Sequence, residues 1–319
     1  MQKMIVVMLT AAMFMAVPAL CFAATSYANV VVVAKSGGDY ASLAQAMNSI
    51  TPTADSPYII KIKPGVYTEP AMVLKSYVDI EGSGTVSTII NPQFSGQLYF
   101  SCWGSLNGSI SNLSIIAEDI PADMAHYLFY LDNVAGYNPA HLFKFINVDI
   151  KGTSTGLFNI YGILASSTNF EFRDSSIDID LKNGSYAVGI QNFVANLTIK
   201  NSKIRTNRTG PSANSLSIGL MHLGGNAMVV GTEIESNDEQ PSNGGAAVLA
   251  GGCSGECGTT PNIVIMNSIL KGNNALKTDS TNSVPGKISA ATSQIVGEIT
   301  GNVKLFNNFD ASFAAISNQ

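Results

Sequence analysis

The stretch of sequence that decides the fold is Ile199-Lys200-Asn201-Ser202-Lys203-Ile204. Aliphatic residues flank a polar turn, and the same order occurs earlier as Phe172-Arg173-Asp174-Ser175-Ser176-Ile177. Further copies are Ile110–Ile115, Phe145–Ile150, Val229–Ile234, Ile265–Leu270 and Ala290–Ile295. A strand, turn and strand unit that recurs in this way indicates a repeat architecture, in which stacked units bury a common core.

The turn residues of these copies set the period. With one earlier residue that begins the series, they are Gly82, Asn112, Asn147, Asp174, Asn201, Gly231, Asn267 and Thr292. Successive positions are 30, 35, 27, 27, 30, 36 and 25 residues apart, and each interval fits one coil. Asn, Asp and Gly tolerate left-handed backbone, so the chain can turn there without a hairpin. The sequence therefore predicts an all-β, single-stranded right-handed parallel β-helix.

A row of charged residues predicts the register of the coils. Side chains alternate along a strand, so the residue after each inward aliphatic points outward. These residues are Lys151, Asp178, Arg205, Glu235 and Lys271. Their signs alternate, so each charge would face an opposite one on the next coil, about 4.8 Å away. A structural ladder is one interpretation of this row, and a catalytic row of carboxylates and arginine is the other.

Both ends of such a helix need covers, because an open coil exposes unpaired strand edges. At the N-terminal end we expect Asp39 to cap a helix with one apolar face. That face would consist of Tyr40, Leu43, Ala44, Met47 and Ile50. At the C-terminal end we expect a plug formed by Phe306, Phe309, Phe313 and Ile316.

The N-terminal residues predict export. An apolar run from Ile5 to Leu20 follows Lys3, and Cys21-Phe22-Ala23 comes next. The run is shorter than the about 20 residues of a membrane-spanning helix, and small residues suited to cleavage follow it. We therefore expect residues 1–23 to be a signal peptide and residues 24–319 to be one β-helix domain, secreted or held in the periplasm or cell envelope. Lipidation at Cys21 is a second interpretation, which the bulky Leu20 disfavours.

Charge and cysteine content limit the partners. Cleavage removes Lys3 and changes the net charge from −5 to −6, and no basic run remains, so we expect no nucleic-acid partner. We expect a monomer without a cofactor. Cys253 and Cys257 lie in a glycine-rich stretch that could close a small disulfide, whereas Cys102 is left unpaired or joins two chains. The three histidines are scattered without ligand spacing, so the sequence predicts no metal site.

Several segments resemble pectin methylesterases. Val33–Ala46 is similar to their opening strand and capping helix, and Ile60–Glu69 is similar to their strand that ends in Pro-Gly-x-Tyr. Asp79–Gly84 with Thr88–Ile90 resembles the next coil, and the resemblance continues more thinly to about residue 300. It implies a pectin lyase-like β-helix with a groove for cell-wall polysaccharide.

The resemblance fails at the catalytic motifs of that family, which has Gln-Asp-Thr-Leu-Tyr on one coil and Asp-Phe-Ile-Phe-Gly on a later one. Ser154 stands in place of the Gln, Thr155 in place of the first Asp, and Ser185 in place of the nucleophilic Asp. The later Leu-Gly-Arg falls near Leu249–Gly251, without an arginine. The family's chemistry resembles a two-carboxylate mechanism assisted by an arginine. Because the aligned positions carry none of these groups, the catalytic residues of this chain are unknown.

Two hypotheses for the function follow. The first is a non-catalytic β-helix that binds polysaccharide or serves as a structural surface module. The second is a polysaccharide-active enzyme, a carbohydrate esterase or a pectate lyase-like protein, and two carboxylates and an arginine within about 6 Å in a groove would favour it. Candidate residues for the lyase are Asp174, Asp178, Asp180, Lys203 and Arg205. Aromatic residues for core packing or a sugar-stacking platform are Trp103, Tyr127, Phe129, Tyr130, Tyr137, Phe158 and Tyr161.

Overall fold

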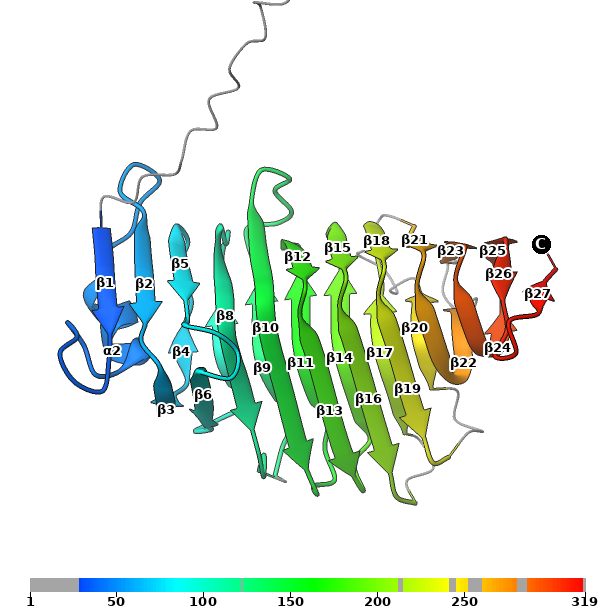
Figure 1. Ribbon diagram of the computed structural model, residues 1–319, viewed down its shortest axis with the longest axis horizontal. Helices are drawn as coiled ribbons and strands as arrows, with labels where there is room; N and C mark the ends of the chain where they lie inside the picture. The colour runs from blue at the N-terminus through cyan, green and yellow to red at the C-terminus, as the bar shows by residue number, and fades with distance from the viewer. Residues whose placement is uncertain are drawn as a thin grey trace, which may run out of the picture.

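The computed structural model describes residues 29–121, 123–211, 215–240, 245–251, 260–279 and 286–317. Here the strands wind into coils that stack along the long axis of the molecule (Figure 1). Named strands pair in parallel, apart from β26 (Asn308–Phe309), which pairs antiparallel with β27 (Ala315–Ile316). The architecture is the right-handed parallel β-helix that the repeat predicts. The expected signal peptide, Cys253 and Cys257 lie outside the described residues.

Three parallel sheets, here called A, B and C, form the walls. Sheet A consists of β1 (Asn29–Val33), β2 (Tyr58–Ile62), β5 (Val78–Glu81), the first parts of β8 (Gly108–Ala117) and β10 (Leu142–Ser154), β12 (Asn169–Arg173), β15 (Leu197–Lys200), β18 (Asn226–Val230), β21 (Asn262–Met266), β23 (Lys287–Ala291) and β25 (Val303–Phe306). Sheet B consists of β3 (Gly65–Pro70), β6 (Thr88–Gln93), the second parts of β8 and β10, β13 (Ser176–Lys182), β16 (Lys203–Thr209), β19 (Glu233–Asp238), the first parts of β22 (Ile269–Asp279) and β24 (Gln294–Thr300), and β26. Sheet C consists of β4 (Met72–Val73), β7 (Leu98–Cys102), β9 (His126–Asp132), β11 (Ile160–Ser166), β14 (Tyr186–Phe193), β17 (Leu216–His222), β20 (Ala246–Gly251) and the second parts of β22 and β24.

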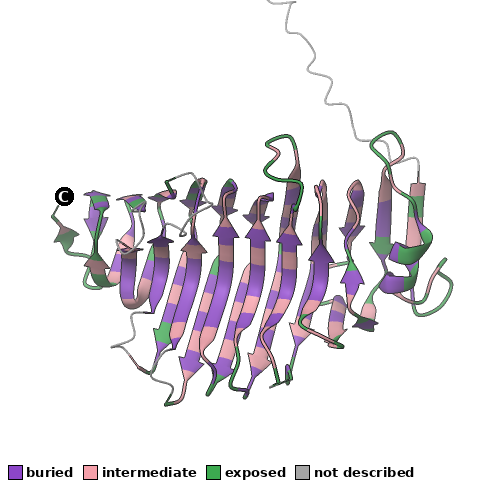
Figure 2. Ribbon diagram, turned by 180° about the vertical axis from the view of Figure 1, so that it is seen from behind, coloured by how far each residue is buried: buried purple, intermediate pink, exposed green. Residues whose placement is uncertain are grey.

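The core is a set of stacks with one residue from each coil. Burial alternates along β13, where Ile177, Ile179 and Leu181 point inward and the residues between them are partly exposed. Figure 2 shows this alternation as purple and pink bands along the strands. The first aliphatic or aromatic residue of each repeat is buried and in register with the next. This stack is Ile60, Ile80, Ile110, Phe145, Phe172, Ile199, Val229, Ile265, Ala290 and Leu305.

The corner between sheets A and B confirms the predicted turn positions. All seven from Asn112 to Thr292 have φ between 48° and 60°, which is left-handed backbone. Gly82 is the exception, because its φ is not positive. A Cβ atom there would collide with the carbonyl oxygen of Asn112, so close packing explains this glycine. The structure adds one more corner, at Asn307 with φ 50°.

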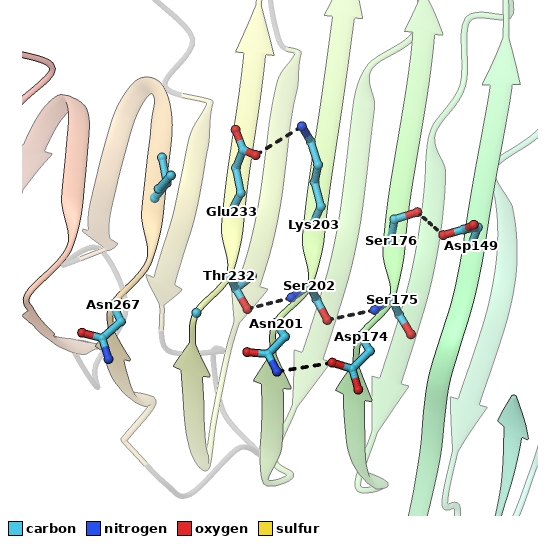
Figure 3. Close-up of a pocket in the computed structure, with 12 residues that line it drawn as sticks. Asp149, Asp174, Ser175, Ser176, Asn201, Ser202, Lys203, Thr232, Glu233 and Asn267 are labelled. Atoms are coloured by element: carbon cyan, nitrogen blue, oxygen red, sulfur yellow. Dashed lines mark hydrogen bonds and ion pairs between the residues drawn. The ribbon is translucent and has the colours of Figure 1, made fainter. Parts of the chain in front are cut away.

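Hydroxyl groups buried just after these corners hold the coils together. Ser202 Oγ accepts a hydrogen bond from the backbone N–H of Ser175 at 3.3 Å and donates to the carbonyl of Lys200 at 2.7 Å. Thr232 and Ser268 repeat both bonds one and two coils further on. Figure 3 shows the bonds between Ser175, Ser202 and Thr232. The hydroxyl ladder, as we call it, is Ser175, Ser202, Thr232, Ser268 and Ser293. These hydroxyls accept hydrogen bonds from backbone N–H groups that have no sheet partner because the chain turns there.

The charged row has the predicted register but only part of the predicted pairing. Lys151, Asp178, Arg205, Glu235 and Lys271 lie directly opposite one another on successive coils. Arg205 binds Asp178 at 2.7 Å, as expected. The two lysines instead bind Glu118 at 3.4 Å and Glu233 at 2.7 Å. Long side chains reach diagonal neighbours as readily as direct ones, and this explains the difference.

The N-terminal cover is a short helix whose cap differs from the prediction. Helix α2 (Leu43–Ser49) begins after Ser42, and Asp39 instead accepts a hydrogen bond from the N–H of Val32. The buried carboxylate of Glu69, on β3, accepts hydrogen bonds from the N–H groups of Leu43 and Ala44 and from the Ser42 hydroxyl. A carboxylate from the next coil therefore ties the helix to the core.

The predicted C-terminal plug is wrong for three of its four residues. The exposed fractions of Phe306, Phe309 and Phe313 are 60%, 38% and 74%. Ile316 alone of the four packs against the core. Strand alternation explains Phe306 and Phe309, because Leu305 on β25 and Asn308 on β26 take the inward positions and turn these two rings outward.

Candidate functional site

The outward face of sheet C gathers aromatic side chains from three adjacent coils. Tyr127 and Tyr130 point outward from β9, whereas Phe129 between them is fully buried. Tyr161 lies opposite Tyr127 on β11, and Trp103 follows the end of β7. We call Trp103, Tyr130, Tyr127 and Tyr161 the aromatic row. Of the residues expected in a platform, Phe129 belongs to the core and these four to the surface.

Contacts within the aromatic row decide which ring surfaces remain free. Tyr127 and Tyr161 stack face to face, with centroids 4.7 Å apart and an interplanar angle of 11°. Tyr130 meets Tyr127 edge-on at 5.5 Å and Trp103 at a tilt at 5.0 Å. Since the stacked tyrosines cover each other, Trp103, which is 50% exposed, offers the largest open ring surface.

The phenol groups of the row stay protonated over a wide pH range. Burial, with a smaller contribution from the neighbouring Tyr127, raises the pKa of Tyr161 to about 12. Burial also raises the pKa of Tyr127 and, together with Asp132, the pKa of Tyr130. Each phenol can therefore both donate and accept a hydrogen bond at the rim of the row.

Loops at both ends of the sheet C strands add further aromatic surface. The loop of residues 133–141, which projects beyond the coils just before β10 (Figure 1), contains Tyr137. The Tyr137 hydroxyl accepts a hydrogen bond of 2.6 Å from the side-chain amide of Asn196. At the other end of the strands, Leu157 and Phe158 are exposed.

The three positions aligned with catalytic residues lie at the corner between sheets B and C. Ser154 is buried, and its hydroxyl donates to the carbonyl of Ile120 at 2.8 Å and accepts from the N–H of Gly156 at 3.1 Å. Thr155 is exposed beside a shallow pocket of about 450 Å³, and Ser185 is partly buried. Within the described part of the chain, none of these hydroxyls forms a hydrogen bond with a histidine or a carboxylate.

A polar groove of about 570 Å³ runs along the corner between sheets A and B (Figure 3). Its polar side chains bind one another across coils. Ser176 donates to Asp149 at 2.7 Å, and Asn201 donates to Asp174 at 3.3 Å. Lys203 forms an ion pair with Glu233 at 3.2 Å, beside the hydroxyl ladder. The groove is thus a structural seam, because its carboxylates already have partners.

The carboxylates proposed for a lyase meet an arginine on the outward face of sheet B. Arg205 Nη2 lies 2.7 Å from carboxylate oxygens of both Asp178 and Asp180. Asn207 also donates to Asp180 at 2.8 Å. Two carboxylates and an arginine thus lie within about 6 Å of one another, as an enzyme would require. None of the three lines the corner groove, however, and of the lyase candidates only Asp174 and Lys203 do. Among the described residues, no group of three or more His, Cys, Asp or Glu side chains is placed to hold a metal ion.

Sequence reasoning missed a buried ion pair at the corner between sheets B and C. Arg208 is fully buried and donates from Nε to Asp238 at 3.0 Å. Its Nη1 and Nη2 groups donate to the carbonyls of Gly184 and Gly210. The signal for this pair was the coil period, which places Arg208 opposite Asp238 on β19.

Fold and surface together define a right-handed parallel β-helix protein with an exposed aromatic face. No protein-family model matches the chain, and no curated protein matches its sequence. Among the described residues, no helix is long and apolar enough to cross a membrane.

Similar solved structures belong to the pectin lyase-like fold. Pectin methylesterase from carrot is 15% identical, with a TM-score of 0.52 over 91% of this chain and 85% of that one. Pectin methylesterase PemA from Erwinia chrysanthemi is 15% identical, with a TM-score of 0.49 over 92% of both chains. The A-module of mannuronan C-5 epimerase AlgE4 from Azotobacter vinelandii is 13% identical, with a TM-score of 0.49 over 85% of this chain and 73% of that one. Identities this low establish the fold alone.

Proposed function

We propose that this chain is an exported β-helix protein that binds polysaccharide on the outward face of sheet C and does not cleave it. The aromatic row is the observation that supports the proposal. Aromatic rings bind the apolar C–H faces of sugar rings, while phenol groups bond to sugar hydroxyls at their edges. The row crosses three coils, about 10 Å along the helix axis, so a bound glycan chain would follow this axis.

The positions aligned with catalytic residues support the non-catalytic part of the proposal. A serine or threonine is a weak nucleophile unless a base lies within hydrogen-bond reach. The Ser154 hydroxyl is engaged by Ile120 and Gly156, and no histidine or carboxylate bonds to Thr155 or Ser185 within the described residues. We therefore expect the protein to leave a bound glycan intact.

Affinity electrophoresis of the purified mature chain in gels that contain plant, bacterial and algal polysaccharides tests the proposal. We expect at least one polysaccharide to retard the protein and Trp103→Ala to weaken the retardation at least tenfold. Phe313→Ala, which removes an exposed ring near the C-terminal end and away from the aromatic row, is the control and should have no effect. If no polysaccharide retards the protein, or if both variants behave alike, the proposal is wrong and a structural surface module remains.

A second candidate function is polysaccharide cleavage or de-esterification, which the contact of Arg205 with two carboxylates favours. Mass analysis of methylated and acetylated pectins after incubation, across pH and with added calcium, separates the two. Loss of methyl or acetyl groups, or shortened unsaturated chains, would establish an enzyme. Loss of that activity in Asp178→Asn or Asp180→Asn would then assign it to this cluster.

Export is the third part of the proposal and depends on residues 1–23. Expression of the full chain in a bacterial host, followed by fractionation and N-terminal sequencing, tests it. We expect the mature protein to begin at Ala24 and to be found in the periplasm or the medium. A cytoplasmic protein that retains Met1 would contradict this part alone.

A further inference from the structure

We propose that the aromatic row selects uncharged or esterified sugars over polyuronates, because Asp132 places a carboxylate among its rings. This inference rests on the proposed glycan binding and names the class of glycan. Asp132 is the last residue of β9, two residues beyond Tyr130, and like Tyr130 it is partly exposed on the outward face. The preceding Leu131 pairs with Cys102, so the residues that follow them, Asp132 and Trp103, are neighbours on adjacent coils.

The directions of two pKa shifts agree with this position of the Asp132 carboxylate. After burial, it is the largest cause that raises the pKa of the Tyr130 phenol. It also contributes to raising the pKa of the Cys102 thiol, on the coil before. The carboxylate therefore sits between the coils of Trp103 and Tyr130, at the edge of the largest free ring surface.

One basic side chain, Lys75, lies in line with Trp103 and Asp132, two coils before Asp132, but its ammonium group donates to the carbonyl of Ile50 at 2.7 Å. Asp132 takes part in none of the ion pairs formed by the described residues. The positions in line with Tyr130 on the other coils are occupied by Val73, Ser101, Leu164, Gln191, Met221, Leu249 and Lys277. The first cation in this line, Lys277, is thus five coils away from Tyr130, about 24 Å.

The charge distribution has opposite consequences for two kinds of glycan. A carboxylate accepts strong hydrogen bonds from neighbouring hydroxyls of a neutral sugar. A uronate at the same place would bring a second negative charge within a few ångströms without a counter-charge, and like charges at that distance repel. The row therefore suits neutral glycans and uronate chains whose carboxyl groups are esterified.

Homogalacturonan supplies a matched pair of probes, because the fully methyl-esterified and the unesterified chain share one backbone and differ in charge. We would measure both by calorimetry with the full mature chain at low salt, beside a neutral galactan. We expect the esterified chain and the galactan to bind at least tenfold more tightly than the unesterified chain. The difference should shrink with added salt, because exposed charges are screened.

Asp132→Asn keeps the shape of the side chain and removes its negative charge. We expect it to reduce the discrimination to threefold or less, mainly by improving the binding of the unesterified chain. Asp55→Asn removes the same charge from an exposed turn near the N-terminal end and should leave the discrimination unchanged. Asp132→Ser is a second variant if the amide disturbs folding, and thermal melting checks both.

The outcomes separate this inference from the proposed function. If Trp103→Ala weakens binding but the unesterified chain binds as tightly as the esterified one, the row binds glycans and the selection by Asp132 is wrong. If discrimination is present and Asp132→Asn leaves it intact, another group causes it and the inference is equally wrong. If neither probe nor the galactan binds, the proposed function fails and the inference fails with it.

Discussion

The corner between sheets A and B and the outward face of sheet C use polar groups in opposite ways. At the corner, the hydroxyl ladder and the Asn and Asp side chains bind one another from coil to coil (Figure 3). On the face, the phenols and the Asp132 carboxylate are partly exposed beside an open indole ring. Groups that satisfy one another stabilise the fold, and groups left partly free are available to a ligand. Mutations at the corners should therefore lower the stability of the fold, whereas mutations on the outward face of sheet C should weaken glycan binding.

The largest effect on stability is expected at the corner between sheets B and C, which contains the buried ion pair of Arg208 and Asp238. Arg208→Ala leaves the buried Asp238 carboxylate without its cation, which costs about 3–5 kcal/mol. Urea unfolding followed by circular dichroism measures this loss. The double variant Arg208→Met with Asp238→Leu should recover most of the stability. A loss below 1 kcal/mol in the single variant would mean that the pair is not buried.

Acid should weaken the corner between sheets C and A through His222. The side-chain amide of Asn192 donates to its Nδ1 atom, and its Nε2 atom lies 3.0 Å from the carbonyl of Gly225. Burial lowers the pKa of His222 from 6.5 to about 4 and outweighs the opposing effect of the Gly225 carbonyl. Between these pH values the unfolded chain binds a proton that the folded chain does not. Stability contributed by neutral His222 is therefore complete above pH 6.5 and falls as the pH drops towards 4.

The loss amounts to about 3 kcal/mol at pH 4, since each pKa unit corresponds to about 1.4 kcal/mol. Unfolding free energies of the wild type and of His222→Gln at pH 7 and pH 4 test this. We expect a smaller decrease for the variant, because it lacks the buried imidazole and is otherwise the same protein. Equal decreases would show that His222 is not the responsible group.

The hydroxyl ladder should show a smaller effect. Ser202→Ala removes the acceptor of the Ser175 N–H and leaves that group buried without a partner, at a cost of about 1–3 kcal/mol. Ser176→Ala is the matched control, because its hydroxyl binds Asp149 in the partly exposed groove. Urea unfolding should rank Ser202→Ala well above Ser176→Ala. The reverse order would mean that the ladder is not what holds this corner.

The charged row on sheet B should contribute least among these structural features. Asp178 lies opposite both Lys151 and Arg205, and partly exposed ion pairs contribute about 0.2–1 kcal/mol. Asp178→Lys should be more destabilising than Asp178→Ala, because it places like charges opposite one another. Equal unfolding free energies of the two variants would contradict the role assigned to this register.

The corner and the register could be predicted from the sequence because local rules govern them. Left-handed backbone at Asn201 and its equivalents, and alternation at Asp178 and Arg205, depend on the residue and its immediate neighbours. Ser42, the N-cap of α2, follows the local rule and lies three residues from the predicted Asp39, whereas the support from Glu69 could not be predicted, because Glu69 acts from the next coil. The C-terminal plug is wrong because hydrophobicity alone does not decide the side of a strand, whereas alternation places Leu305 inward and Phe306 outward.

The aromatic face could be predicted only in part. The sequence shows that aromatic residues concentrate here. It does not show which of them point outward, because strict alternation would place Tyr127 and Phe129 on the same side of β9. The structure instead buries two successive residues, Leu128 and Phe129, and β11 does the same at Gly162 and Ile163. A side chain at Gly162 would meet the carbonyl of Gly189 on the next coil, so close packing between coils fixes this irregularity. Such packing depends on the whole stack and is not visible in one strand.

The smallest effect on stability, and the sharpest separation of the two regions, is expected for Trp103→Ala. Half of the indole surface is exposed, and its neighbours in the row, Tyr127 and Tyr161, remain stacked on each other without it. Substitutions at such surface positions change stability by about 0.5 kcal/mol or less. We therefore expect an almost unchanged urea midpoint together with a large loss of glycan binding, whereas Ser202→Ala should show the opposite combination. If Trp103→Ala unfolds as readily as Ser202→Ala, the aromatic row stabilises the coils as the corner does, and its assignment as a binding surface is wrong.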